Sequence, residues 1–401
     1  MTAAIIITLC VLLLFAYVFD VTASKTRIPS VVLLLLLGWG VRQGTIHSGL
    51  SVPDLNPVLP VLGTVGLILI VLEGSLELEL NRSKIPVIVK SAFGALLPML
   101  GISFGMAMAF QYFGGVDLLT GLANAVPFAV ISSAIAIPSA KHLERADREF
   151  ITYESSLSDI FGVIFFNFVA LNDHVDGKVV GNFLFELLVL LLISIVSTIA
   201  LAFLLSKSRH HVKYAPIILL LILIYTILKI YHLPSLIFIL LFGLALGNLK
   251  NFRENKFIQK VHPEILNREV HKFRELTVEM TFLIRSLFFL LFGYLIETKE
   301  LINPDTIIWA VAVTAGIFVI RALVLKLFSL PLQPLLFIAP RGLITILLFL
   351  SIPLNQSLGL ANKSLVIQVI ILTSFVMMYG LMKTKKRELP PETQTGNQEI
   401  I

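Results

Sequence analysis

Long apolar runs alternate with short polar connections along the chain, and this alternation restricts the folds that it can adopt. The runs are about 17 to 25 residues long, the length that an α-helix needs to cross the ~30 Å hydrocarbon layer of a membrane. Of the 401 residues, 57% are hydrophobic and 14% are charged, whereas soluble domains carry about 25% charged residues. Because backbone groups inside a bilayer must hydrogen-bond internally, the sequence predicts an all-α polytopic membrane protein.

Thirteen transmembrane spans can be drawn, and spans 5 and 12 share an unusual feature. Each contains a proline beside small or polar residues, in "ISSAIAIPSA" and "FIAPRGLIT". Interrupted spans at matching positions in two halves indicate inverted repeats and a transport site near the membrane midplane. Spans 5 and 12 are therefore predicted to be broken helices. The predicted spans are roughly 3–21, 28–41, 57–78, 87–113, 117–140, 149–171, 181–206, 215–231, 234–249, 276–297, 305–329, 331–354 and 364–383.

Lysine and arginine predict the orientation. One set of alternate connections holds most of the chain's 31 basic residues, which predicts that this side is cytoplasmic. The N-terminus is then outside and the C-terminus inside. We expect one transmembrane domain over residues 1–384 and a short cytoplasmic tail over 385–401. The long connection 250–275 is predicted to be a cytoplasmic linker helix, with a solvated linker as the alternative. The connections on the predicted outer side hold few basic residues, which are Arg42, Lys178, Lys229, Lys299 and Lys363.

Composition argues against several classes of protein. The single cysteine permits no internal disulfide, and all eight histidines lie in the connections between apolar runs, where they cannot ligate an intramembrane haem or metal centre. The net charge of +6 fits membrane topology better than nucleic-acid binding. We therefore expect neither an enzyme nor a cofactor, and an alkali cation as the only metal.

Asp159 is the acidic residue nearest the middle of a span. It lies about ten residues into span 6, in "FITYESSLSDIFGVIFF". Ser155 and Ser156 precede it by four and three positions, so their hydroxyls share its helical face. Burial favours the protonated carboxyl and a bound cation favours the ionised one, so H⁺ and a cation compete for it. The alternative is a packing ion pair with Arg285 or Arg321.

Other charged or interrupted positions predict supporting roles. Glu154 points away from Asp159 and is expected to form a structural ion pair with Arg321. Glu73, one turn inside the end of span 3, is either a cation ligand or a boundary charge. Pro138 is expected to break span 5 and free backbone carbonyls near 134–136, which could coordinate an alkali cation, or only to kink the helix. Arg341 can offset half-helix dipoles at the crossover or bridge to carbonyls.

These motifs, in this order, resemble those of the NhaP/NHE-type monovalent cation:proton antiporters. The resemblance covers essentially the whole chain. It places Glu73 of "LEGSLELEL" on an acidic position that helps bind the ion, and Asp159 of "ESSLSD" on the ion- and proton-binding aspartate. It pairs Arg321 of "FVIRALVL" with Glu154, and it matches "APRGLIT", with Arg341, to the broken twelfth helix and "LFFLLFGYLI" to the tenth span.

Two positions depart from the family pattern. Ser158 stands where the family usually has asparagine, and Ala136-Ile137-Pro138 stands where it usually has "T-D-P". A charge and a threonine side chain are thereby lost, although the Ala136 carbonyl remains as a ligand. The predicted cation ligands are Asp159, Ser155, Ser158, Glu73 and Ala136. Compensating oxygens are available from Ser132, Ser133, Ser139 and Ser155.

The sequence thus predicts a secondary antiporter that exchanges Na⁺ for H⁺ across a bacterial-type plasma membrane. The resemblance implies a homodimer, in which a core bundle with spans 5, 6, 12 and 13 moves against a dimerisation bundle. A K⁺/H⁺ antiporter is the nearest alternative. A non-transporting sensor or scaffold derived from an antiporter is the alternative from another class. The lost Thr-Asp pair favours it slightly, and the intact Asp159 with Glu154 and Arg321 argues against it.

Overall fold

Every regular element in the described chain is helical, and each predicted span has a helical counterpart, which confirms the all-α polytopic fold. The computed structural model describes residues 2–26, 28–49, 53–78, 80, 82–141, 143–170, 172, 176–207, 212–231, 233, 235–248 and 263–383. The unbroken spans are α1 (Thr2–Thr26), α2 (Ser30–His47), α3 (Val58–Glu77), α4 (Ile85–Gly114), α7 (Arg145–Ala170), α8 (Gly177–Lys207), α9 (Tyr214–Ile230), α10 (Leu236–Gly247), α12 (Pro263–Tyr294), α14 (Pro304–Leu327) and α16 (Lys363–Lys383).

Spans 5 and 12 are each divided, as the sequence predicted. Span 5 consists of α5 (Leu118–Ala129) and α6 (Ser133–Ser139), and span 12 consists of η3 (Leu335–Phe337) and α15 (Leu343–Leu350). Eight stretches of the described residues are long and apolar enough to cross a membrane by length and composition. The remaining short elements are η1 (Arg82–Lys84), α13 (Thr298–Leu301) and η4 (Leu354–Gln356).

The tenth span begins earlier than the sequence indicated. Helix α12 starts at Pro263, so the described part of the predicted 250–275 linker is continuous with the span. Arg274 on this extension forms an ion pair with Glu77 at the end of α3, with a nitrogen–oxygen distance of 2.8 Å. The rest of the linker, 250–262, and the predicted tail, 385–401, lie outside the described residues.

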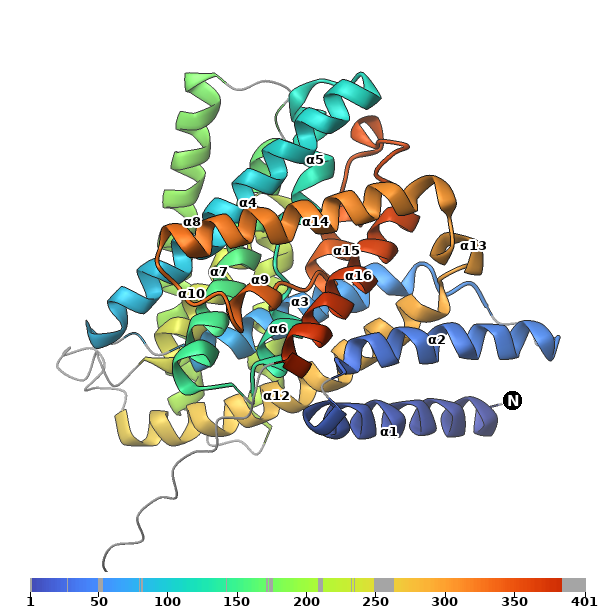
Figure 1. The fold of residues 1–401 in the computed structure, drawn as a ribbon. Helices are drawn as coiled ribbons and strands as arrows, with labels where there is room; N and C mark the ends of the chain where they lie inside the picture. The colour runs from blue at the N-terminus through green and yellow to red at the C-terminus, as the bar shows by residue number, and fades with distance from the viewer. Residues whose placement is uncertain are drawn as a thin grey trace, which may run out of the picture.

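The helices pack in two groups. Helices α4, α5, α6, α7, α14, α15 and α16 pack chiefly on one another and form the core group. Helices α1, α2, α3, α8, α10 and α12 pack on one another and form the second group. Figure 1 shows α1 and α2 side by side at one edge, next to α12. Helix α3 links the groups, because it also contacts α6, α7 and α15.

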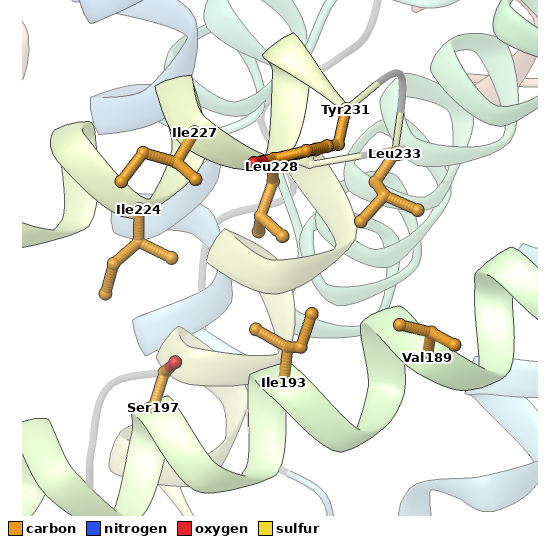
Figure 2. Close-up of a pocket in the computed structure, with 8 residues that line it drawn as sticks. All are labelled: Val189, Ile193, Ser197, Ile224, Ile227, Leu228, Tyr231 and Leu233. Carbon is orange, nitrogen blue, oxygen red and sulfur yellow. The ribbon is translucent and has the colours of Figure 1, made fainter.

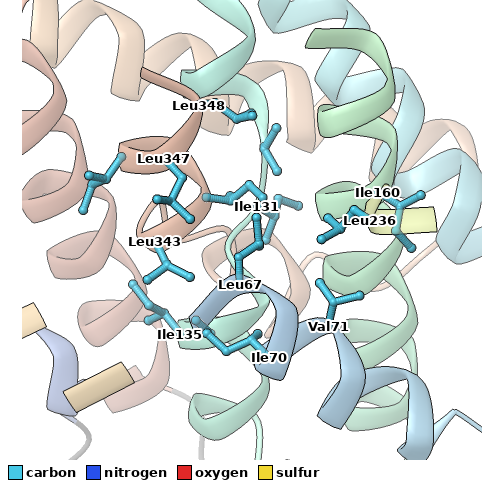
Figure 3. Packing of buried hydrophobic residues seen from close by; sticks show 14 of the residues in the cluster. Leu67, Ile70, Val71, Ile131, Ile135, Ile160, Leu236, Leu343, Leu347 and Leu348 are labelled. Carbon is cyan, nitrogen blue, oxygen red and sulfur yellow. The ribbon is translucent and has the colours of Figure 1, made fainter. Parts of the chain in front are cut away.

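The contact between the two groups is apolar. Figure 3 shows Leu67, Ile70 and Val71 of α3 among side chains from the crossover, from α7, from α10 and from α15. Each of these α3 residues is buried. Apolar side chains make no directional hydrogen bonds, so sliding of one group against the other along this α3 layer breaks few specific bonds. The buried residues that surround these three α3 side chains include Ile131, Ile135, Ile160, Leu236, Leu343, Leu347 and Leu348.

Within the second group, α2 and α12 cross closely because both have glycine at the crossing. A β-carbon added at Gly38 would lie 2.2 Å from the Leu290 carbonyl oxygen, and one at Gly293 would lie 2.3 Å from the Leu35 carbonyl oxygen. Such distances are far inside van der Waals contact, so only glycine allows the two backbones this approach. Small residues have the same use in other membrane-helix interfaces.

We expect Gly38→Ala to destabilise the protein by roughly 1–3 kcal/mol, because the methyl group forces α2 and α12 apart. Gly40→Ala is the matched control on the same helix, since a β-carbon there meets nothing within 4 Å. Thermal unfolding of the purified variants in detergent measures the difference. Equal unfolding midpoints for the two variants would contradict close packing at this crossing.

Candidate functional site

Helix α7 carries two polar stripes through the core group. Glu154 and Ser158 are four residues apart, and so are Ser155 and Asp159, so each pair lies on one face of the helix. All four side chains are buried. The polar N-terminal turns of α7 contain Arg145 and other charged residues, and the segment after Asp159 is apolar, as expected of a helix that enters a membrane from a polar edge.

The breaks in spans 5 and 12 lie against each other. The extended segment 130–132 separates α5 from α6, and the non-helical segment 338–342 precedes α15. The Ser132 amide donates a hydrogen bond to the Pro340 carbonyl oxygen over 2.9 Å. Two broken helices that meet in this way form the crossover that the paired prolines suggested.

The position of the break in span 5 corrects the prediction made from Pro138. The chain leaves the helix at Val130, and Pro138 lies inside α6. The Ala136 carbonyl accepts a hydrogen bond from the Ala140 amide over 3.0 Å, so Pro138 does not free it. A proline removes only the hydrogen bond to the carbonyl four residues before it, here that of Ala134, which lies within the predicted range 134–136. Pro138 is therefore not a crossover residue, and Ala136 is a weaker candidate ligand than the sequence indicated.

Asp159 faces the start of α6. Its Oδ2 accepts a short hydrogen bond from the Ser133 hydroxyl, and its Oδ1 is buried without a hydrogen-bond partner among the described residues. The side chain is only 2% exposed. Within the described chain, Asp159 forms an ion pair with neither Arg285 nor Arg321, so the packing alternative is wrong. A buried carboxyl with a free oxygen and no basic partner favours binding of a proton or a cation.

Two neighbouring serines make local hydrogen bonds. The Ser158 hydroxyl accepts a hydrogen bond from the Ile131 amide over 2.9 Å, which joins α7 to the break in span 5. The Ser155 hydroxyl donates to the Ile151 carbonyl oxygen over 2.8 Å. Ser158 therefore satisfies an amide that the interrupted helix leaves unpaired, a role that a side-chain oxygen at this position can fill.

Arg341 satisfies the carbonyl end of the first half-helix of span 5. Its guanidinium donates to the carbonyl oxygens of Phe128 over 2.7 Å, Ala129 over 3.1 Å and Ala339 over 2.7 Å. The arginine is 1% exposed. Its charge lies at the negative end of the α5 dipole, where a cation is favourable. Both interpretations drawn from the sequence, dipole compensation and carbonyl bridging, describe this one contact.

Glu154 and Arg321 lie in contact as a bidentate ion pair. Arg321 donates to Oε1 over 2.8 Å and to Oε2 over 2.7 Å, and its Nε donates to the Leu335 carbonyl oxygen over 2.9 Å. Each side chain is 1% exposed. The pair joins α7, α14 and η3, so Arg321 is bound to Glu154 rather than to Asp159.

Glu73 lies on a different side of α3 from the crossover. The polar groups of α12 beside it are the Thr281 hydroxyl and the Arg285 guanidinium. The next residue, Gly74, is the one that faces α7, because a β-carbon there would lie 3.3 Å from the Ser156 hydroxyl. No described contact joins Glu73 to Asp159, so the structure does not bring these two predicted ligands together.

The partner of Arg285 is an acidic residue that the sequence pattern did not predict. Asp20 of α1 forms an ion pair with Arg285 at 3.6 Å and also accepts a hydrogen bond from Ser30. The available signal was an acidic residue near the end of the first span, opposite an unpaired arginine in the tenth. Arg285, Arg321 and Arg341, the three basic residues deep in the spans, are thus each satisfied by contacts other than Asp159.

A hollow of about 550 Å³ lies elsewhere, between α8 and α9. Its lining is apolar except for Ser197 and Tyr231, as Figure 2 shows. Such a lining suits lipid chains and offers little to an ion. Among the described residues, no group of three or more His, Cys, Asp or Glu side chains is placed to hold a metal ion. Among the described acidic side chains, Asp159 is the one that is buried with an unpartnered oxygen.

Comparison with known proteins identifies the family to which the chain belongs. The family sequence model described as "Sodium/hydrogen exchanger, transmembrane" matches residues 10–382. The chain belongs to the sodium/hydrogen exchanger family. This exchanger therefore falls among transporters of monovalent cations and protons rather than in an enzyme class, and it is a multi-pass membrane protein. Among curated protein sequences, no relative of this exchanger was found.

Solved structures show the same fold. A structure of the sodium proton antiporter MjNhaP1 from Methanocaldococcus jannaschii at pH 8 is similar with a TM-score of 0.65 and 17% identity, over 94% of this exchanger and 95% of that chain. An electron-microscopy structure of the same antiporter gives a TM-score of 0.66 and 18% identity, over 95% of each chain. At this level of identity, the likeness shows the fold alone.

Proposed function

We propose that this protein is a secondary antiporter that exchanges a monovalent cation, Na⁺ in the first place, for H⁺ by alternating access at Asp159. The observation that carries the proposal is the environment of Asp159. Its carboxyl is buried, and one of its oxygens is unpartnered among the described residues. The two arginines considered as its partners, Arg285 and Arg321, form ion pairs with other acidic residues. An ionised carboxylate in this position is costly, so it requires a proton or a cation.

This requirement produces exchange. If the core group moves only when Asp159 is neutralised, a cation carried in one direction must be replaced by a proton or another cation before the return. The crossover supports such a movement, because Arg341 and Ser158 satisfy the broken ends of span 5 without using the carboxylate. The apolar contact along α3 supports sliding of the core group against the second group.

Several finer properties belong to the same proposal. The protein acts as a homodimer in a bacterial-type plasma membrane, with the N-terminus outside and the C-terminus in the cytoplasm. It needs no cofactor. Ser155, Ser158 and Glu73 remain candidate ligands of the cation or its approach path. One carboxylate changes its occupant, so the exchange is one cation for one proton and is electroneutral.

Purified protein in liposomes with an imposed pH gradient tests the function. We expect Na⁺, added outside, to collapse the gradient that an internal pH-sensitive dye reports. An imposed membrane potential alone should drive no exchange, because an electroneutral cycle moves no net charge through a field worth about 2.3 kcal/mol per charge per 100 mV. Collapse by potential alone would contradict the stoichiometry, and failure of Na⁺, K⁺ and Li⁺ alike would contradict antiport.

A K⁺/H⁺ antiporter is the second candidate. The observation that favours it is the lack of side-chain oxygens at Ala136 and Ile137, where the family usually has threonine and aspartate, which leaves Asp159 without a second carboxylate from this stretch. A site with few charged ligands has a weak electrostatic field. Such a site replaces the hydration shell of a large ion such as K⁺ more easily than that of a small ion such as Na⁺. Adding K⁺ in place of Na⁺ in the same liposomes distinguishes the two. A sensor or scaffold becomes the better interpretation if neither ion collapses the gradient.

A further inference from the structure

We propose that Ser156, together with Ser133, supplies side-chain oxygens to the cation that binds at Asp159. The inference rests on the proposed function and specifies its binding site. It replaces the ligand expected from the Ala136 carbonyl with two hydroxyls from the faces of α6 and α7 that pack together.

The first observation is the state of the Ser156 hydroxyl. It is buried, the side chain is 8% exposed, and its Oγ has no hydrogen-bond partner among the described residues. A hydroxyl in a helix can ordinarily donate to the carbonyl four residues before it, as Ser155 does to Ile151. Ser156 makes no such bond. A buried polar atom left in this way is unfavourable unless a ligand or water satisfies it.

The second observation is the neighbourhood of this hydroxyl. Ser156 precedes Asp159 by three positions, so the two side chains lie on adjacent turns of one face. A similar one-turn spacing occurs across the contact on α6. There Ser133 bonds to Asp159, and Ile137, four residues on, lies with Ser156 beside the position of a β-carbon at Gly74. The face of α6 that contains Ser133 and Ile137 therefore lies antiparallel to the face of α7 that contains Asp159 and Ser156.

These atoms form a set of ligands suited to an alkali cation. Asp159 Oδ1 and Ser156 Oγ are unpartnered oxygens of one helical face, and Ser133 Oγ is already bound to the other carboxylate oxygen. A hydroxyl has two lone pairs and a hydrogen that rotates, so Ser133 can donate to the carboxylate and still accept a cation on a lone pair. Hard cations prefer carboxylate, hydroxyl and carbonyl oxygens of this kind.

Gly74 limits the size of this site from the side of α3. A β-carbon there would lie 3.3 Å from Ser156 Oγ and 4.0 Å from the Ile137 side chain, so it fits with only a small shift. The added methyl group would fill space next to the hydroxyl without removing a ligand. Gly74→Ala should therefore discriminate against a large cation more than against a small one.

Cation-dependent collapse of a pH gradient in proteoliposomes tests the inference, with Li⁺, Na⁺ and K⁺ titrated separately. We expect Ser156→Ala to raise the KM for the transported cation by about tenfold and to change the order of preference among the three ions, because an oxygen that contacts the charge is lost. Gly74→Ala should raise the KM for K⁺ more than that for Li⁺. Ser194→Ala, a buried serine of α8 bonded to the Leu190 carbonyl, is the control and should change neither.

The outcomes separate this inference from the function on which it rests. If wild type exchanges a cation and Asp159→Asn does not, but Ser156→Ala keeps the wild-type KM and ion preference, the inference is overturned and the function stands. If wild-type protein with a normal unfolding midpoint exchanges no cation, both fail. A changed ion preference in Ser156→Ala with an unchanged unfolding midpoint supports the role as a ligand, since loss of packing alone does not reorder the ions.

Discussion

Asp159→Asn is expected to reduce cation-driven proton movement in proteoliposomes to the leak of liposomes without protein. The amide has nearly the shape of the carboxyl, but it neither binds a proton at physiological pH nor carries a charge for a cation. Because Asp159 is proposed to hold both ions in turn, its loss should abolish both halves of the cycle. Dye-reported collapse of a pH gradient by Na⁺, K⁺ and Li⁺ measures this directly.

The stability of the same variant decides how its loss of activity is interpreted. Asp159 has no ion-pair partner among the described residues, so removing its charge should leave the protein at least as stable as wild type. A normal or higher unfolding midpoint with no exchange indicates a functional carboxylate retained at some cost in stability. An inactive variant that unfolds early would leave its folding, rather than ion binding, as the cause.

A matched control guards against a general effect of removing an acid. Asp305, an exposed residue in the first turn of α14, undergoes the same chemical change in Asp305→Asn. We expect this variant to exchange ions at the wild-type rate. Asp159→Glu keeps the charge but displaces it, and should retain part of the exchange. Wild-type rates in Asp159→Asn would show that the ions bind elsewhere and would contradict the proposed mechanism.

The sequence was sufficient for those parts of the site that strong physical constraints determine. A charge inside a bilayer needs a partner or a purpose, and this rule alone drew attention to Asp159, to Glu154 with Arg321, and to Arg341. The number of spans could be predicted from the length of the apolar runs, because a helix must be about 20 residues long to cross the hydrocarbon layer. The contact between Glu154 and Arg321, 167 positions apart, is visible in the sequence only because buried charges are so rarely left alone.

The sequence was insufficient where several local solutions were available. Pro138 suggested the break in span 5, yet the chain leaves the helix eight residues earlier, where Val130 to Ser132 lie against span 12. Tertiary contact decided the position, since Ser158 and Pro340 satisfy the freed amides there. The choice among four serines near Asp159 was likewise open, because hydroxyls rotate freely and only the packing of α6 on α7 selects Ser133. Asp20 was not predicted as the partner of Arg285, because an acidic residue at the end of a span, with its side chain 28% exposed, does not need a buried partner.

Breaking the ion pair between Glu154 and Arg321 should have the largest effect on stability. Either Glu154→Gln or Arg321→Gln leaves a charge that is almost fully buried without its bidentate partner, and such losses cost about 3–5 kcal/mol. Both residues are 1% exposed, so water cannot replace the missing partner without entering the core group. We expect each single variant to unfold well below wild type, as measured by thermal unfolding of purified protein in detergent.

The double variant separates a paired role from two independent ones. With glutamine at both positions no charge is left alone, so the double variant should be more stable than the sum of the single losses predicts. Additive losses would show that the two side chains do not act as a pair. Thermal unfolding of wild type, both single variants and the double variant in one detergent provides the comparison.

Transport by the surviving folded protein then distinguishes structure from function at Glu154. If the pair only holds α7 against α14 and η3, folded Glu154→Gln protein should retain the wild-type KM for the cation, and its lower activity should follow the lower yield of folded protein. A changed KM or a changed dependence on proton concentration would instead place Glu154 among the ion-binding groups. Because Arg321 also donates to the Leu335 carbonyl, Arg321→Gln should loosen span 12 more than Glu154→Gln does. The pair is thus expected to hold α7, α14 and η3 together, while Asp159 remains free to exchange a proton for a cation.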